Sequence, residues 1–390
     1  MRFSVPTNFS EGFLDRLPAG SVASVYGKLP QDCVGGGRPS FMLPAVSRAG
    51  LKKHVEDIHK RGLLFNYLLN AACLGNAEFT PGGRRQIRSL LDWLVQIKAD
   101  SVTVAVPYLA QLIKKHYPRL RLYVSSFANI NSLPKALFWQ DMGADLIVLE
   151  PTSVNRDFDT LRSIRKGIRC GLELVANNAC LLNCPFNEYH QKINAHASRG
   201  HSALGHAAAN FCSLNCKFLR LKDPVNFICS DWIRPEDAHY YEEAGIDSLK
   251  IAGRARGADF ILKALGAYID KGYKGNLADL FPFFYGNGAP VVSGEKKEML
   301  GRALRYFPRL LGAGFLLNLK ITRALSEFEV YIDNAALDGF LEFFVQGGCK
   351  KKADSRACGH CREFAKRAVR FPEGFSKDSL LSKYEELLNA

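Results

Sequence analysis

The sequence predicts an α/β fold, namely a (β/α)8 TIM-like barrel with a smaller helix-rich C-terminal module. Short apolar runs alternate with segments of helical periodicity from about residue 20 to residue 275. Most of these runs are continuous rather than alternating, which is typical of parallel strands buried on both faces. The αβ junctions number about eight, which fits a closed barrel better than an open sheet.

Eight predicted strands lie in this region. They are SVASVYG (21–27), LLFNYLLN (63–70), SVTVAVP (101–107), RLYVSSF (121–127), DLIVLEP (145–151), GLELVAN (171–177), NFICS (226–230) and SLKIAG (248–253). A weak repeat places an aspartate just before three of the strands, in KADSVTVAVP, GADLIVLEP and GIDSLKIAG. Repeated junctions of this kind favour a barrel. An open doubly wound sheet is the alternative, although no Gly-x-Gly-x-x-Gly motif follows the first strand.

The segments between the strands carry the start and stop signals of helices. Thr80 can cap a helix that has Pro81 at its first position. One apolar face of this helix is formed by Ile87, Leu90, Leu91, Leu94 and Ile97. Gly62 can end the helix before it, and a later helix begins at the Arg-Pro-Glu-Asp segment 234–237 and ends near Gly245.

Two domains are expected. Residues 1–285 form the predicted barrel, and residues 286–390 form the helix-rich module, with one strand at 328–334, that packs against it. No run of about 18 apolar residues occurs, so no membrane span is expected. The first residues lack the apolar stretch of a signal peptide, and the protein is therefore predicted to be cytoplasmic.

Charge and cysteine content narrow the classes of function. The net charge of +14 attracts anionic partners such as nucleic acid, anionic lipid or acidic small molecules, unless it is only a solvated basic surface. The eleven cysteines are an odd number, which argues against a closed disulfide framework. In a reducing compartment, clustered cysteines indicate metal binding or catalysis.

Four cysteines give the strongest chemical signal. They form two C-x3-C pairs that share the pattern Leu-Asn-Cys: Cys180 with Cys184, and Cys212 with Cys216. The first pair follows the strand GLELVAN, where a barrel presents its active-site loops. Four thiolates can hold a 4Fe–4S cluster or a zinc ion, and the spacing favours the cluster because zinc pairs usually have tighter C-x2-C turns. The alternative without metal is that these are buried free cysteines.

The residues around these cysteines resemble a known family. The segments ELVANNACLLNCPFNEYH, FCSLNC, LRLKDPVNFICSDWIRPED and IDSLKIAGR look like those of the collagenase-like peptidase family U32, over roughly residues 20 to 275. The resemblance implies a barrel-like catalytic domain and a cysteine-bound 4Fe–4S cluster. It also implies oxygen-independent hydroxylation of ubiquinone precursors or RNA bases, in some members with prephenate as the oxygen source. The cysteine spacing departs from that of better-known branches, so Cys33 and Cys229 are reserve ligands.

Candidate pocket residues lie near the C-terminal ends of the predicted strands or beside the cysteines. Such positions face the pocket of a barrel, and arginine suits carboxylate or phosphate recognition. Each residue also has a purely structural explanation, in turn hydrogen bonds or ion pairs. The candidate catalytic residues are Glu173, Asn177, His190 and Lys250. The candidate substrate-binding residues are Asn70, Glu150, Arg220 and Arg254.

Three further cysteines, Cys349, Cys358 and Cys361, lie in the predicted C-terminal module. With His360 they could bind a second metal, or they could be structural cysteines. The sequence Cys-Gly-His-Cys also resembles a disulfide-exchange motif, but the strand that such a motif needs directly before it is missing.

From these features we expect a 4Fe–4S barrel enzyme that hydroxylates or similarly modifies an aromatic or nucleobase-like substrate without molecular oxygen. The expected partners are an anionic or aromatic small molecule, or RNA, and an electron donor. A peptidase is one alternative, although neither Gly-x-Ser-x-Gly nor His-Glu-x-x-His occurs. The other is a noncatalytic RNA-binding or scaffold protein with a structural metal, which the positive charge permits and no RNA-recognition motif supports.

Overall fold

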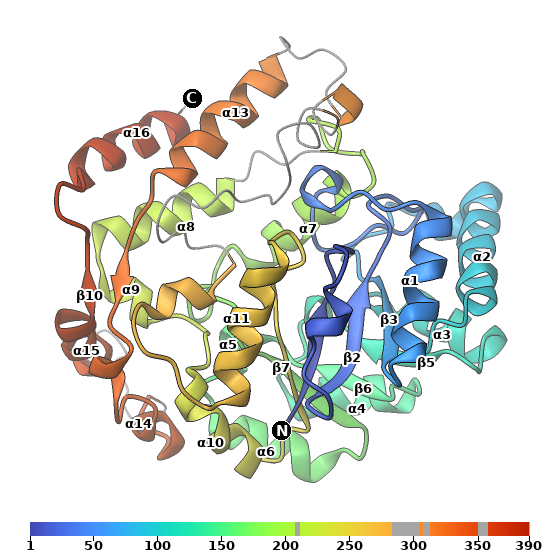
Figure 1. The fold of residues 1–390 in the computed structure, drawn as a ribbon, viewed down its shortest axis with the longest axis horizontal. Helices are drawn as coiled ribbons and strands as arrows, with labels where there is room; N and C mark the ends of the chain where they lie inside the picture. Colours follow the sequence, from blue (N-terminus) through green and yellow to red (C-terminus); the bar gives the residue numbers. More distant parts are fainter. Residues whose placement is uncertain (207–210, 283–300, 302–303, 307–312, 350–357, 390) are drawn as a thin grey trace.

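Eight parallel strands close into a barrel in the computed structural model, which describes residues 1–206, 211–282, 301, 304–306, 313–349 and 358–389. The strands pair in sequence order, and β1 (Arg2–Pro6) also pairs with β8 (Ser248–Lys250), so the barrel sheet has no free edge. The others are β2 (Val22–Gly27), β3 (Leu64–Leu69), β4 (Ser101–Val104), β5 (Arg121–Val124), β6 (Leu146–Val148) and β7 (Gly171–Val175). The predicted (β/α)8 fold is confirmed (Figure 1).

One predicted strand is wrong. Segment 226–230 lies mostly in the short helix α9 (Val225–Ile228). The Asp223 side chain accepts a hydrogen bond from the Val225 N–H, and the Cys229 N–H donates to the Val225 carbonyl. The helical turn therefore satisfies backbone groups that a strand would pair with a neighbour.

The eighth strand is instead β1, at the start of the chain, which the sequence analysis missed. It pairs with β2 and also with β8, which comes at the end of the barrel sequence. In the pairing with β8, Arg2 is in register with Ser248. Phe3 to Pro6 are buried. A five-residue strand defined by such distant pairing leaves only a weak local pattern.

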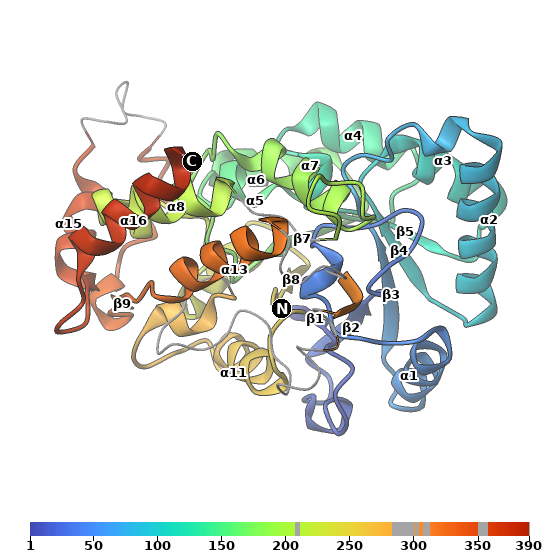
Figure 2. The same cartoon turned by 90° about the horizontal axis from the view of Figure 1, so that it is seen from above.

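Helices cover the outside of the barrel (Figures 1 and 2). Between β2 and β7 they are α1 (Arg48–Lys60), α2 (Pro81–Gln96), α3 (Pro107–His116), α4 (Leu133–Asp141), α5 (Pro151–Val154) and α6 (Phe158–Gly167). The predicted start of α2 is confirmed, because Thr80 Oγ1 accepts a hydrogen bond of 3.0 Å from the Gly83 N–H. Its predicted apolar face is buried against the barrel.

The connection from β7 to β8 is the longest in the barrel. It carries α7 (Asn187–Ala197), α8 (Phe211–Lys222), α9 and α10 (Ala238–Glu243), and α11 (Ala258–Ile269) follows β8. As predicted, the segment at 234–237 precedes α10, and Gly245, with a φ of 87°, follows its end. This insertion contains all four cysteines of the two C-x3-C pairs.

The aspartate repeat has a common structure. One aspartate precedes each of β4, β6 and β8, namely Asp100, Asp145 and Asp247. In each case the Oδ2 atom accepts a hydrogen bond of 2.7–2.8 Å from a backbone N–H at the start of the neighbouring strand. The donors are Phe65, Leu122 and Leu172. The same oxygen also contacts one basic side chain each, namely His59, Lys114 or Arg165. These contacts lie at the N-terminal ends of the strands, where barrel residues serve stability.

The C-terminal elements lie on one side of the barrel, opposite α1 to α3 (Figures 1 and 2). They are α13 (Ala313–Ser326), β9 (Tyr331–Ile332), α14 (Glu342–Val345), α15 (His360–Ala368), β10 (Val369–Arg370) and α16 (Lys377–Asn389). Helix α16 packs against α8, and α15 against α9. The strand expected at 328–334 is present as the shorter β9. The expected domain boundary at residue 285 lies outside the described residues.

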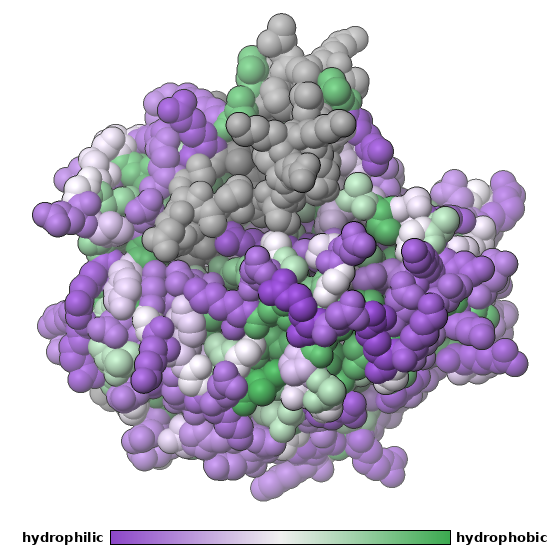
Figure 3. All heavy atoms as spheres, in the orientation of Figure 1, coloured by the Kyte–Doolittle hydropathy of each residue, from purple (hydrophilic) through white to green (hydrophobic). Residues whose placement is uncertain are grey.

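Among the described residues, no helix has the length and apolar character needed to cross a bilayer. Hydrophilic side chains cover most of the face that is seen in Figure 3, with smaller apolar areas between them.

Candidate functional site

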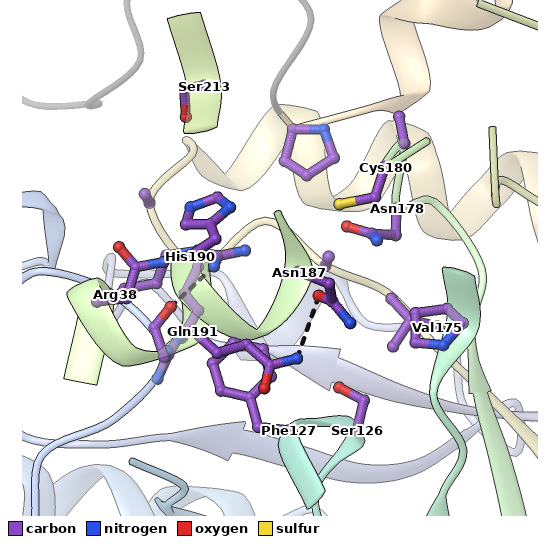
Figure 4. A pocket seen from close by; sticks show the side chains of 18 of the residues that line it. Arg38, Ser126, Phe127, Val175, Asn178, Cys180, Asn187, His190, Gln191 and Ser213 are labelled. Carbon is purple, nitrogen blue, oxygen red and sulfur yellow. Dashed lines mark hydrogen bonds between the residues drawn. The ribbon is translucent and has the colours of Figure 1, made fainter. Parts of the chain in front are cut away.

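A cavity of about 320 Å³ lies at the C-terminal ends of the barrel strands. Side chains from the loops after β2, β3, β5, β7 and β8 line it, together with side chains of α7 and α8. In Figure 4, Cys180 and Asn178 lie on one side of the cavity, and Arg38 and His190 on the other. Active sites of (β/α)8 enzymes occupy this end of the barrel.

The loop that carries Cys180 and Cys184 is held by the segment before α10. Asp231 Oδ1 accepts a hydrogen bond of 2.8 Å from the Cys180 backbone N–H, and the Asp231 N–H donates to the Cys180 carbonyl. Asn178 Nδ2 donates to the other Asp231 oxygen at 2.6 Å. Burial raises the pKa of Asp231 to about 7. The buried carboxyl group therefore fixes the start of the cysteine loop.

Cys212 and Cys216 lie four residues apart on α8, so both face the cavity one helical turn apart. Burial raises the pKa of the Cys184 thiol to about 11 and of the Cys212 thiol to about 12, and each of the two also feels the charge of Cys216. The Cys180 pKa is raised too, first by burial and then by Asp231, Cys216 and Cys184. All four cysteines line the same cavity.

These four thiols are the soft donor set that the cavity offers to a metal or cluster. Within the described residues, no three histidine, cysteine or carboxylate side chains are already arranged to coordinate an ion. Two basic side chains flank the last thiol. The Arg220 guanidinium contacts Cys216 Sγ, and such a neighbour stabilises a thiolate. Burial lowers the pKa of Lys217 well below its ordinary value, while the nearby Cys216 charge acts in the opposite direction.

The cavity wall is strongly cationic. It includes Arg38, Lys217, Lys250, Arg254 and Arg256, and no aspartate or glutamate side chain of the described residues lines it. Burial lowers the pKa of Arg254 to about 10, which leaves its guanidinium charged at neutral pH. Arg254 Nη1 is buried and has no hydrogen-bond partner among the described residues.

Lys250 has a carboxylate partner in Glu173. Its Nζ lies 3.4 Å from Glu173 Oε2 and 4.0 Å from the centre of the Tyr26 ring. Glu173 also accepts hydrogen bonds from Ser4 Oγ at 2.5 Å and Ser248 Oγ at 3.1 Å. Burial lowers the pKa of Lys250, while Glu173 acts in the opposite direction. The pair joins β7 to β8 at the floor of the cavity.

Comparison with known proteins gives the family. The model of peptidase family U32 matches residues 37–276, which is more than half of the chain. The chain belongs to peptidase family U32. The resemblance inferred from the cysteine-bearing segments is thereby confirmed, and the matched range contains most of the residues that line the cavity, including the four cysteines.

Two relatives and one solved structure match different shares of this chain. An uncharacterized protease of Methanocaldococcus jannaschii is 31% identical over 346 residues, which is 89% of this chain and 88% of that protein. A tRNA hydroxylation protein P of Escherichia coli is 24% identical over 186 residues, 44% of this chain and 39% of that protein. A solved U32 peptidase is 22% identical with a TM-score of 0.49, over 64% of this chain and 91% of that chain.

Eight of the twelve predicted site residues line the cavity of this U32 protein: Asn70, His190, Lys250, Arg254 and the four cysteines. Asn70 donates a hydrogen bond of 3.3 Å to Ser125 Oγ, and its Oδ1 atom has no partner among the described residues. Burial and the nearby Arg38 charge lower the pKa of His190 to about 4, so its imidazole is neutral at physiological pH.

The other four predicted residues lie behind the wall. Glu173 acts on Lys250, as described above. Asn177 bridges the two loops after β7 and β8, since its Nδ2 donates to the Ala252 and Leu280 carbonyls. Arg220 donates to the Ala179 carbonyl and Ser230 Oγ. Glu150 caps α5 and accepts a hydrogen bond of 3.1 Å from Asn187, which does line the cavity.

Sequence analysis missed several residues that line the cavity. Arg38 follows a run of three glycines, and a Cβ atom on Gly37 would lie 2.5 Å from the Phe127 ring, so this close approach requires glycine. Gln191 donates to Asn187 Oδ1 at 3.1 Å across one turn of α7 (Figure 4). The glycine run in the loop after β2 could have identified the Arg38 loop.

The two reserve cysteines lie elsewhere. Cys33 borders a separate hollow of about 430 Å³ together with Arg48 and Arg85. Cys229 ends α9, and its side chain is hydrogen-bonded to Cys361 of α15. Neither lines the cavity with the four cysteines.

Proposed function

We propose that this U32 protein is a 4Fe–4S enzyme that hydroxylates, or similarly modifies, an anionic aromatic or nucleobase-bearing substrate without molecular oxygen. The observation that carries the proposal is the composition of one cavity. Four cysteines face a wall with five basic side chains and no carboxylate among the described lining residues. This combination suits an electron-transfer group beside an anion-binding site.

The donor set supports the cluster. Cys180, Cys184, Cys212 and Cys216 would hold it, because they are the four thiols of the cavity and iron–sulfur clusters are bound by cysteine thiolates. The thiols lose protons on binding, which costs free energy at buried sites with raised pKa values. Arg220 offsets part of that cost through the positive charge of its guanidinium.

The substrate class follows from the cationic wall. A buried guanidinium nitrogen without a partner loses hydration energy that a bound anion restores. Arg254 Nη1 is such a group, and Arg38 lies close enough for its charge to act on the pKa of Arg254. Tyr26, Phe41 and Phe127 provide aromatic surface in the same cavity. A carboxylate or phosphate attached to an aromatic ring meets both requirements.

The bound cluster would supply electron transfer or an acidic metal site at the cavity wall. The remaining tasks belong to the protein. Arg254 and Arg38 would orient the anionic group, the aromatic side chains would hold the ring, and the neutral imidazole of His190 would accept or return a proton. Replacing a substrate hydrogen with hydroxyl removes two electrons. An oxygen-bearing organic donor takes up these two electrons as it gives up a hydroxyl group and gains the hydrogen.

The relatives bear differently on the alternatives. Hydroxylation is in the name of the Escherichia coli tRNA relative, which supports an RNA substrate. Protease is in the name of the Methanocaldococcus jannaschii relative. A cysteine peptidase needs a thiolate nucleophile, whereas burial raises the pKa values of Cys180, Cys184 and Cys212. The hydroxylase proposal therefore has the stronger physical support.

The test is an anaerobic reaction of iron-loaded protein with unmodified tRNA, and separately with small aromatic acids, in the presence of prephenate. Mass spectrometry should find product that has gained one oxygen atom, and Arg254→Ala protein should form much less of it. Salt-dependent RNA binding without any product would favour the scaffold alternative. Peptide cleavage that needs Cys184 but no iron would favour the peptidase.

A further inference from the structure

A second group of cysteines lies outside the cavity, where α9 and α15 pack together. A side-chain hydrogen bond joins Cys229, at the end of α9, to Cys361, in the first turn of α15. Cys361 is buried. Cys349 lies close enough for its charge to act on Cys361. Two cysteines that lie far apart in the sequence thus meet where the barrel insertion contacts the C-terminal elements.

The C-terminal cysteines have the spacing of a metal-binding turn. Cys358 and Cys361 are separated by two residues across the start of α15, and Gly359 is the cap of this helix. The C-x2-C turn is the common half of a tetrahedral zinc site, in contrast with the C-x3-C pairs of the cavity. The side chain of His360 is already used, because it stacks on Phe343 and is hydrogen-bonded to the Phe340 carbonyl. A cysteine from another segment must therefore supply a ligand, and Cys229 is in place.

A buried cation next to this pair points to negative charge at the site. Arg156 is 6% exposed and lies beside Cys229, since it donates to the carbonyl of the preceding residue, Ile228. Its Nη1 donates 2.8 Å to the Ile228 carbonyl, but Nε and Nη2 have no hydrogen-bond partner among the described residues. Its guanidinium stacks 4.5 Å from the Trp232 ring and 4.6 Å from the Phe340 ring. The two unsatisfied nitrogens of this buried guanidinium favour an anionic group beside it.

We propose that Cys229, Cys349, Cys358 and Cys361 form a second metal centre that binds zinc, separate from the four cysteines of the cavity. Four thiolates around Zn²⁺ carry a net charge of about −2, which Arg156 partly offsets. In the described residues the ligands are not yet at coordination distance. Metal binding would draw Cys349 and Cys358 onto the Cys229–Cys361 pair.

The position of this centre gives it a structural role. Cys229 belongs to the segment that holds the cavity loop: its carbonyl accepts from the Leu182 N–H, and Asp231 binds Cys180. An Arg362–Asp223 ion pair with an Nη2–Oδ2 distance of 2.8 Å already joins α15 to the insertion just before α9. Zinc would cross-link α15 to the insertion at the base of that loop.

The experiment uses full-length protein purified anaerobically, with zinc and iron measured separately by mass spectrometry. The parent protein should hold about one tightly bound zinc per chain in addition to its iron. Cys349→Ser and Cys358→Ser protein should lose zinc affinity at least tenfold, measured by competition with a coloured chelator, and keep their iron. Cys349 is exposed, so Cys349→Ser should fold. Cys170→Ser, which changes a cysteine of neither group, is the control and should keep both metals.

Three results would overturn the proposal. The first is parent protein without zinc, and the second is Cys349→Ser and Cys358→Ser protein with unchanged zinc affinity. The third is a Cys229–Cys361 disulfide found in the anaerobically purified parent by mapping under non-reducing conditions. Zinc that disappears with Cys180→Ser instead would place the ion in the cavity, and would also contradict the cluster proposal there.

Discussion

Burial decides the chemistry of the individual side chains in the cavity. The same environment that raises the pKa values of the thiols lowers those of His190 and Arg254. It therefore keeps the free cysteines protonated and the histidine neutral, while Arg254 remains charged. These properties depend on position in the fold, since the same residue types in water titrate at their ordinary values.

Arg254→Ala should weaken binding of an anionic substrate or of a nonreacting analogue by about 1.5–3 kcal/mol, because a charged hydrogen-bond donor is lost. Iron content should not change. Arg16→Ala, at a partly exposed arginine that is away from the cavity, is the control. A dissociation constant and turnover equal to those of the parent would place the substrate elsewhere.

Each of Cys180, Cys184, Cys212 and Cys216 should be needed for iron retention, because loss of one thiolate opens the cluster to oxidation. Anaerobic parent protein should be brown, absorb near about 400 nm and contain roughly four irons and four sulfides per chain. Cys216→Ser protein should lose iron, whereas Cys33→Ser protein should keep it. If Cys33→Ser protein lost iron and Cys216→Ser protein kept it, Cys33 rather than Cys216 would be the ligand. Colourless parent protein that contains zinc alone would contradict the cluster.

His54 should make stability pH-dependent. Burial lowers its pKa from 6.5 to about 4 in the folded chain. As the pH falls below about 6.5, the unfolded state takes up the proton before the folded state does. The stabilising contribution of neutral His54 is therefore full above that pH, and it is lost progressively as the pH falls towards 4. Urea unfolding of His54→Gln protein should therefore lose less stability between these pH values than the parent does. The exposed substitution His116→Gln should leave the parent slope unchanged.

At the scale of elements, the αβ junctions set the barrel geometry. An aspartate before each of three strands bonds the neighbouring strand and a basic side chain at the N-terminal end of the barrel. The cavity lies at the opposite end. Stability and function thus use different ends of the same strands, as is general for this architecture.

Asp145→Ala should lower the free energy of unfolding by about 1–3 kcal/mol, because the Leu122 N–H and Lys114 lose their partner. Guanidinium unfolding measures this loss. Asp141→Ala, at an exposed residue near the end of α4, should have a much smaller effect. Equal stabilities of the two variants would show that the repeat is not a structural device.

At the scale of the whole molecule, the C-terminal elements support the cysteine-bearing insertion. Helix α16 packs on α8, which carries Cys212 and Cys216. Phe328 packs against Phe227 of α9 with ring centres 5.7 Å apart. The part of the chain after the barrel is therefore in contact with the helices that position half of the proposed cluster ligands.

Tyr384→Ala should reveal this support. The side chain is fully buried in α16, and its hydroxyl donates to the Ala324 carbonyl at 3.1 Å. Truncation should cost about 3–5 kcal/mol, as for other large buried aromatic residues. Thermal unfolding should occur at lower temperature, and iron should leave α8 faster on dilution into chelator. Tyr331→Ala, at an exposed tyrosine of β9, should change neither measurement.

The sequence by itself determined the features that depend on neighbouring residues. Apolar runs marked seven of the eight strands, Thr80 marked a helix start, and the paired cysteines with their flanking segments determined the family. These signals are local, because strand and helix periodicity and capping act within a few residues.

Only the tertiary structure decided what depends on distant contacts. The pairing of β1 with β8 closes the barrel, and it joins the two ends of the barrel sequence. Arg38, Lys217 and Arg254 come from separate segments and meet in one cavity, and Glu173 and Arg220 lie behind its wall. Cys229, placed by sequence in a strand, ends a helix beside Cys361. Folding selects such contacts through the burial of the whole core, which no short segment encodes.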